Sequence, residues 1–75
     1  MAEHLLDARG LSCPLPILKA GRALKSLRVG EALRVLSTDP VSVADFEDFC
    51  RATGAALVES GQDGGVYSFL IKRLA

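Results

Sequence analysis

The chain has 75 residues, of which 49% are hydrophobic and 24% are charged. This length predicts one small domain covering residues 1–75, and the composition excludes an intrinsically disordered chain. Nine basic and nine acidic residues give a net charge of zero, which argues against nonspecific nucleic-acid binding as the main role. Two cysteines, Cys13 and Cys50, are too few for a disulfide framework, so a packed core has to hold the fold.

The first ten residues, MAEHLLDARG, contain neither a basic start nor a long apolar run. A secretory signal is therefore not expected, and no apolar stretch reaches the length of a transmembrane helix. We expect a cytoplasmic protein with no membrane association. In that reducing location a cysteine can remain free.

The first half of the chain predicts a strand, a helix and a second strand. The strand covers His4 to Ala8 and ends at a turn formed by Arg9 and Gly10. The helix runs from about Pro14 to Leu27, with Lys19 and Arg22 on its outer side. Its inner face is predicted to contain Ile17, Gly21 (or Ala20), Leu24 and Leu27, with Leu18 alongside. After a chain reversal at Gly30, alternation predicts a strand over Glu31–Ser37, with Leu33 and Val35 on one face and Arg34 on the other.

The second half predicts a helix followed by a hairpin. Ser42 and Asp45 have the spacing of a capping box before a helix over about Val43–Thr53, which stops at Gly54. The buried stripe of that helix is predicted to be Val43, Phe46, Phe49 and Cys50. The segments AALVES and VYSFLIK predict two strands joined by the glycine-rich GQDGG. The order β-α-β-α-β-β predicts an α+β fold: a two-layer α/β sandwich with a four-stranded mixed sheet and two helices on one face.

Cys13 is followed by two prolines at the predicted helix entrance. Proline is tolerated in the first helical turn, so Pro14 fits the first helical position and Pro16 still lies in that turn. Cys13 then lies at or just before the N-cap, and the prolines stiffen the entrance and hold the sulfur outward. The positive helix end is expected to lower the thiol pKa from about 8.5 to roughly 7–8, and Arg9 or Lys19, if close, would lower it further.

The charges are unevenly distributed along the chain. Between Arg9 and Arg28 there are five bases and no acids, whereas Asp39 to Asp63 contains six acids and one base, Arg51. The segregation predicts either two solvated helix faces or a basic docking surface around Cys13 for an acidic partner, and the two interpretations are compatible.

Several matching residues and segments show a resemblance to the TusA (SirA-like) family of small sulfur-carrier proteins. They are Asp7, Gly10, Leu11, Cys13, Pro14 and Pro16, then VGEALRVL, Asp39-Pro40 and Phe49-Cys50. The resemblance implies the same two-layer fold and a sulfurtransferase activity that depends on partners. Cys13 would accept sulfane sulfur from a cysteine desulfurase or a rhodanese-type donor and hold it as a transient persulfide, without a resident cofactor. The acceptor protein would belong to a pathway for tRNA 2-thiouridine, molybdenum cofactor or sulfur oxidation.

The remaining candidates are assigned supporting roles. Partner binding or loop shaping is expected of Asp7, Arg9, Gly10, Pro14, Pro16, Lys19 and Arg22. Asp7 is expected to order the loop before Cys13, and Arg9 either steers partners or is solvated. Cys50 could be a resolving cysteine but is interpreted as a core residue, because it continues the apolar stripe of the second helix, and His4 is a weak general-base candidate. A metal site is not expected, because there is no CxxC motif and only one histidine.

Two other functions stay open. The C-P-x-P loop could recognise a partner without chemistry, in a regulatory or binding module. RNA binding is suggested by the basic first helix, but the chain has one Tyr, three Phe and no Trp to form a stacking platform, so direct nucleic-acid binding is not expected. A monomer is expected.

Overall fold

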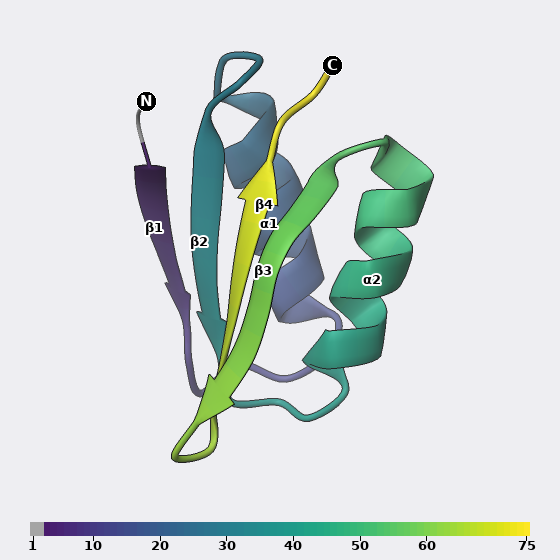
Figure 1. Cartoon of the computed structure of the whole chain (residues 1–75). Helices are drawn as coiled ribbons and strands as arrows, with labels where there is room; N and C mark the ends of the chain where they lie inside the picture. The colour runs from purple at the N-terminus through teal and green to yellow at the C-terminus, as the bar shows by residue number, and fades with distance from the viewer. Residues whose placement is uncertain (1–2) are drawn as a thin grey trace.

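The computed structural model describes residues 3–75 and contains six elements in the order β-α-β-α-β-β (Figure 1). The elements are β1 (Glu3–Ala8), α1 (Leu15–Lys25), β2 (Ala32–Ser37), α2 (Ser42–Thr53), β3 (Ala56–Asp63) and β4 (Val66–Lys72). Both helices are amphipathic, as the spacing of apolar residues predicts. No helix within residues 3–75 is long and apolar enough to cross a bilayer.

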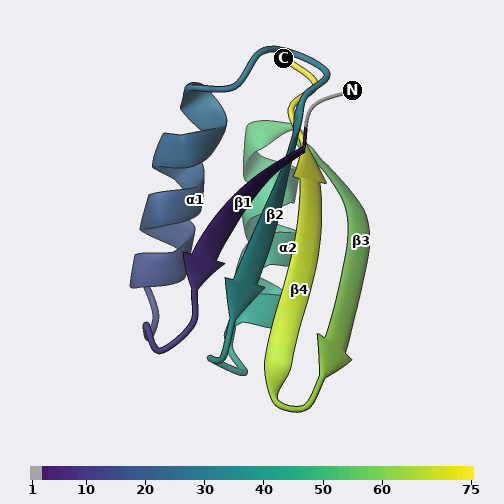
Figure 2. The same ribbon diagram turned by 90° about the vertical axis from the view of Figure 1, so that its left-hand side faces the viewer.

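The four strands form one mixed sheet in the order β1-β2-β4-β3. β1 and β2 are parallel and joined by α1, whereas β4 runs antiparallel to both β2 and β3. α1 packs over β1 and β2, and α2 packs over β3 and β4. Both helices thus cover the same face of the sheet (Figure 2), and the predicted two-layer fold is confirmed.

The core lies between the sheet and the helices. Phe46 of α2 and Phe69 of β4 are both fully buried, and their rings stack with centroids 4.7 Å apart. Leu33 and Val35 of β2 point into the same layer and are 2% and 0% exposed. Burial of each of these side chains contributes about 1.5–3 kcal/mol to the stability of the fold.

Some predicted boundaries and faces differ from the structure. α1 ends at Lys25, two residues before the predicted end, although Leu27 remains buried. Leu18 is 60% exposed, so its predicted placement alongside the inner face was wrong. The sheet and α2 cover a narrower stripe of α1 than the spacing of apolar residues predicted. β3 extends to Asp63, and the hairpin turn is confined to Gly64 and Gly65, which have positive φ angles of 57° and 82°. Such a pair suits the tight turns that match strand twist.

The parallel pairing of β1 and β2 determines where the following loops lie. Both strands point toward the lower end of the view in Figure 1, and the loops that lead into α1 and α2 follow at that end. Residues 9–14, which contain Cys13, therefore lie beside residues 38–41. This neighbourhood is set by the sheet and not by closeness in the sequence.

Candidate functional site

Cys13 lies in the loop between β1 and α1, and its side chain is exposed. Pro14 is the N-cap residue of α1, and the Leu15 N–H donates to the Ser12 carbonyl at 2.9 Å. Pro16 is buried in the first helical turn. The helix begins one residue later than predicted, so Cys13 precedes the N-cap and presents its sulfur to solvent.

Two residues of the neighbouring loop hold the segment that leads to Cys13. The Gly10 N–H donates to the Thr38 hydroxyl at 2.9 Å, and the Cys13 N–H donates to Asp39 Oδ2 at 2.7 Å. Gly10 has a φ of +81°, a left-handed conformation that disfavours residues with a Cβ. The loop is thus held at both ends by the segment that follows β2.

Asp39 also contacts the start of α2. Its Oδ1 accepts a hydrogen bond from the Val41 N–H at 3.1 Å, and its backbone carbonyl accepts one from Ser42 at 3.0 Å. The predicted capping box of Ser42 and Asp45 was wrong. The Ser42 side chain is buried and pairs with the Ser37 hydroxyl at 2.6 Å, so it makes no cap, and Asp45 faces Cys13 instead.

The carboxylates around Cys13 overturn the predicted electrostatics. Hydrogen bonding to Asp45 raises the pKa of the Cys13 thiol above its ordinary value. Desolvation and the negative charges of Asp45 and Asp39 act in the same direction. The expected lowering of this pKa was wrong, because Asp39 and Asp45, which are distant in the sequence, disfavour the thiolate, and neither Arg9 nor Lys19 is among the groups that act on it.

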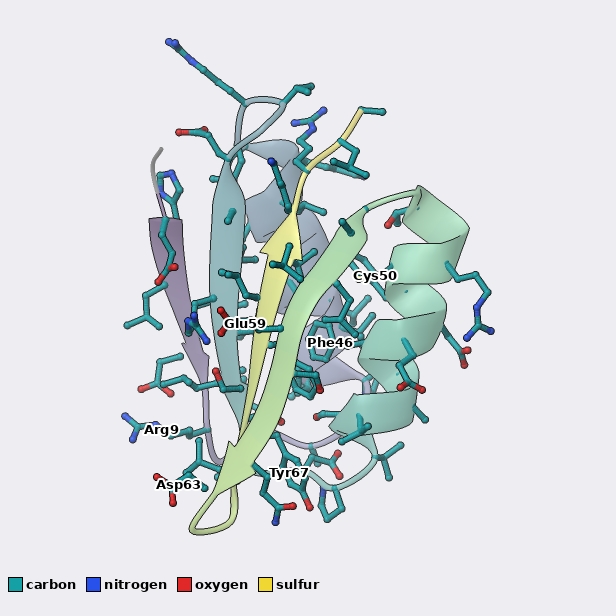
Figure 3. All side chains as sticks on the ribbon, viewed as in Figure 1. Arg9, Phe46, Cys50, Glu59, Asp63 and Tyr67 are labelled. Carbon is teal, nitrogen blue, oxygen red and sulfur yellow. The ribbon has the colours of Figure 1, made fainter. Side chains whose placement is uncertain are left out.

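Asp7 and Arg9 form a separate pair at the end of β1. The Asp7 carboxylate accepts hydrogen bonds from the Arg9 backbone at 3.1 Å and from its guanidinium at 2.8 Å. These contacts hold the pKa of Asp7 at about 2, below its ordinary 3.8, and raise the pKa of Arg9. The Arg9 side chain extends into solvent in Figure 3. Its charge is engaged by Asp7, so it does not lower the pKa of Cys13 as expected.

The other predicted bases lie on the outer side of α1. Lys19 and Arg22 line an open groove of about 620 Å³ together with the apolar side chains of Leu6, Leu15 and Leu18. Leu15 and Leu18 are 44% and 60% exposed. The immediate surroundings of the sulfur are acidic, and the basic residues lie along the helix that begins directly after it. Of the groups in residues 3–75, Asp45 and Asp39 are the charged ones that act on the Cys13 thiol, and Lys19 and Arg22 are not among them.

Cys50 and His4 lie apart from this loop. Cys50 is 6% exposed in the core (Figure 3), and burial raises the pKa of its thiol, which fits the predicted packing role. His4 lies at the opposite end of β1 from Cys13, with its Nε2 3.3 Å from Glu31. In the part of the chain that the structure describes, no three His, Cys, Asp or Glu side chains are grouped as metal ligands would be.

Thr38, Asp39 and Asp45 were not predicted to belong to the site. Parallel pairing of β1 and β2 could have placed Thr38 and Asp39 beside the Cys13 loop, because the carboxyl ends of adjacent parallel strands meet at one edge of a sheet. The approach of Asp45 depends in addition on where α2 begins.

The fold and the site define a class of small two-layer α/β protein that presents one accessible thiol on a loop at the carboxyl ends of two parallel strands. A family model described as sulfurtransferase TusA matches residues 4–73, and the chain belongs to this family. It is 52% identical to the sulfur carrier protein TusA of Allochromatium vinosum over 71 residues, which cover 95% of this chain and 93% of the relative.

Two further similarities support the same assignment. The chain is 37% identical to the sulfur carrier protein TusA of Pseudomonas aeruginosa over 73 residues, covering 97% of this chain and 92% of the relative. The crystal structure of a SirA-like protein from Desulfitobacterium hafniense superimposes with a TM-score of 0.83 at 27% identity. That similarity covers 95% of this chain and 97% of the other.

Proposed function

We propose that this protein is a sulfur carrier that accepts a sulfane sulfur on Cys13 as a persulfide and passes it to an acceptor protein. The observation that carries the proposal is the exposed Cys13 thiol on a loop fixed by Thr38 and Asp39, in a chain of the TusA family. Cys50 is buried, so a donor protein can reach only one of the two sulfurs.

The transfer consists of two thiol exchanges. The Cys13 thiolate attacks the terminal sulfur of a donor persulfide, a new S–S bond forms, and the donor leaves as a thiolate that takes up the proton lost by Cys13. The product is Cys13–S–SH. An acceptor thiolate then attacks the terminal sulfur, the S–S bond to Cys13 breaks, and Cys13 leaves as a thiolate and is reprotonated. No external oxidant or reductant is consumed.

The carboxylates near Cys13 influence both exchanges. A raised pKa reduces the thiolate fraction at neutral pH, but it increases the nucleophilicity of the thiolate that is present. It also makes Cys13 a poorer leaving group in the second exchange. The free carrier is therefore expected to react slowly with small electrophiles and to transfer sulfur only when a partner holds the two sulfurs together.

The partners are a sulfur donor, such as a cysteine desulfurase or a rhodanese-type protein, and a downstream sulfur acceptor. The groove on α1 is a suitable docking surface, because it combines the exposed apolar side chains of Leu15 and Leu18 with the positive charges of Lys19 and Arg22. A partner surface with complementary acidic and apolar side chains would bring its reactive sulfur to the start of α1.

Sulfur loading tests the proposed function. The protein is incubated with a cysteine desulfurase and cysteine, and mass spectrometry locates the added sulfur. One added sulfur is expected on the peptide that contains Cys13, in the native chain and in Cys50→Ala. The proposal fails if Cys13→Ser takes up sulfur as well as the native chain does.

A binding module without chemistry is the second candidate. The raised pKa of Cys13 favours it, since a protonated thiol is a poor nucleophile. In that case Cys13→Ser would bind the donor normally and the native chain would acquire no sulfur.

A further inference from the structure

We propose that Asp39 is a positioning residue for sulfur transfer, whose carboxylate ties the backbone of Cys13 to the start of α2 and so presents the sulfur beside Asp45. The inference rests on the proposed function of Cys13 and adds a residue to it. It concerns a side chain that is 26 positions from Cys13 in the sequence and joins the site only through the fold.

The two carboxylate oxygens of Asp39 serve different segments. Oδ2 accepts the hydrogen bond from the Cys13 N–H at 2.7 Å, and Oδ1 accepts one from the Val41 N–H at 3.1 Å. Hydrogen bonds to an ionised acceptor are short and strong. One side chain therefore fixes the distance between the Cys13 loop and the first turn of α2.

Asp39 is itself held by a buried support. Its backbone N–H donates to the Ser37 hydroxyl at 3.2 Å, and that hydroxyl pairs with the Ser42 hydroxyl at 2.6 Å. Ser37 and Ser42 are 0% and 2% exposed. Because both serines are buried in the core, the backbone of Asp39 is fixed. The hydrogen bond from the Cys13 N–H to Asp39 then fixes the backbone of Cys13 as well.

The adjacent residue reinforces the same arrangement. Thr38 holds the Gly10 N–H at 2.9 Å, so consecutive residues of the β2–α2 loop fix both ends of the segment Gly10–Cys13. A loop held at two points allows the sulfur a narrow range of directions. This restriction is what transfer between two proteins requires, since small misplacements of reacting atoms can cost about 100-fold in rate.

The charge of Asp39 has an effect opposite to its positioning role. Two charged groups act on the thiol: Asp39 in the β2–α2 loop and Asp45 in α2. Both disfavour ionisation of the thiol. Arg9, in the Cys13 loop, is paired with Asp7. Removing the Asp39 charge should therefore make Cys13 more reactive toward a small electrophile while it slows protein-to-protein transfer. A residue that only stabilised the fold would not produce this opposition.

The experiment measures two properties of Asp39→Asn and Asp39→Ser. The first is the pH profile of Cys13 alkylation by iodoacetamide, and the second is the rate of sulfur loading from a cysteine desulfurase. Serine can still accept the hydrogen bond at the start of a helix but cannot reach both Val41 and Cys13, so this variant separates helix capping from positioning. Asp48→Asn is the matched control, because Asp48 is an exposed carboxylate of α2 that pairs with Arg51.

Both Asp39 variants are expected to show an alkylation midpoint at lower pH and loading that is slower by about 10-fold or more, with Asp48→Asn unchanged in both. The inference is overturned if either folded variant loads at the native rate, or if its alkylation profile matches the native one. A native chain that takes up no sulfur refutes the proposed function instead, and the alkylation profile then still decides whether Asp39 acts on Cys13.

Discussion

Arg9 and Asp7 form a two-point ion pair in which Nε and Nη2 of the guanidinium each lie 2.8 Å from one oxygen of the carboxylate. Asp7 is the penultimate residue of β1, and Arg9 is the first residue of the Cys13 loop. It fixes the direction in which the chain leaves the sheet, while Thr38 and Asp39 fix the loop from the other side. The loop is thus held by side chains on both of its flanks.

The ion pair of Asp7 and Arg9 predicts how the stability of the fold changes at low pH. Its folded pKa of about 2 lies below the ordinary 3.8, so its contribution to stability is present above about pH 3.8 and is lost as the pH falls through about 2. Replacing Arg9 with Ala should raise the pKa of Asp7 toward 3.8, because the guanidinium is the main cause of the shift. Carboxyl NMR titration of Asp7 measures this change, and an Asp7 pKa that stays near 2 in Arg9→Ala would show that another group causes the shift.

Asp45 predicts the reactivity of the free thiol. Replacing it with Asn removes the largest cause of the raised Cys13 pKa, so the alkylation midpoint should move to lower pH and the rate of iodoacetamide reaction at pH 7 should rise. Glu47→Gln is the control, since Glu47 is an exposed acid on the same helix and is not among the groups that act on Cys13. Equal alkylation profiles for Asp45→Asn and the native chain would contradict the assigned contact.

Phe46 predicts the response of the core. Phe46→Ala should lower the free energy of unfolding by about 3–5 kcal/mol, because it removes a fully buried ring that stacks on Phe69. Leu18→Ala should change that free energy by no more than about 0.5 kcal/mol, because Leu18 is 60% exposed. Urea denaturation followed by circular dichroism measures both. A loss for Leu18→Ala comparable to that for Phe46→Ala would show that the outer side of α1 is covered in solution.

The α1 groove predicts a salt-sensitive docking step. Reversing the charge of Lys19 and Arg22 to Glu should slow sulfur loading from an acidic donor surface by about 10-fold or more at low salt, and high salt should reduce the difference. Arg51→Glu on α2 serves as the control, because Arg51 lies outside this groove and pairs with Asp48. Loading that is equally fast in the double variant and the native chain would show that the donor docks elsewhere.

Local patterns predicted most of the fold correctly. Alternation located Leu33 and Val35 on the inner face of β2, and helical spacing located Phe46 and Cys50 on the buried side of α2. Both patterns work because a strand or a helix with one covered face imposes its own period on the sequence. Leu18 was misassigned because the width of the covered stripe depends on the neighbouring helix, which spacing within α1 does not report.

The site was predicted less completely than the fold. Cys13 is identified by its own surroundings in the sequence, but Asp39 and Asp45 reach it only after the parallel sheet and the start of α2 are formed. The pKa of Cys13 was predicted from the local helix end and from Arg9 or Lys19, and two carboxylates from the second half of the chain reverse the direction of the shift. Long-range electrostatics requires the topology before it can be evaluated.

The enclosure of Cys50 has a consequence for the fate of the cargo. A persulfide beside a second reachable thiol could discharge within one molecule, closing an internal disulfide and releasing hydrogen sulfide. Here the second thiol lies on the buried side of α2 and is 6% exposed, so this intramolecular reaction is prevented. A sulfur atom loaded on the surface loop would therefore depart only with a thiol that another molecule brings to it.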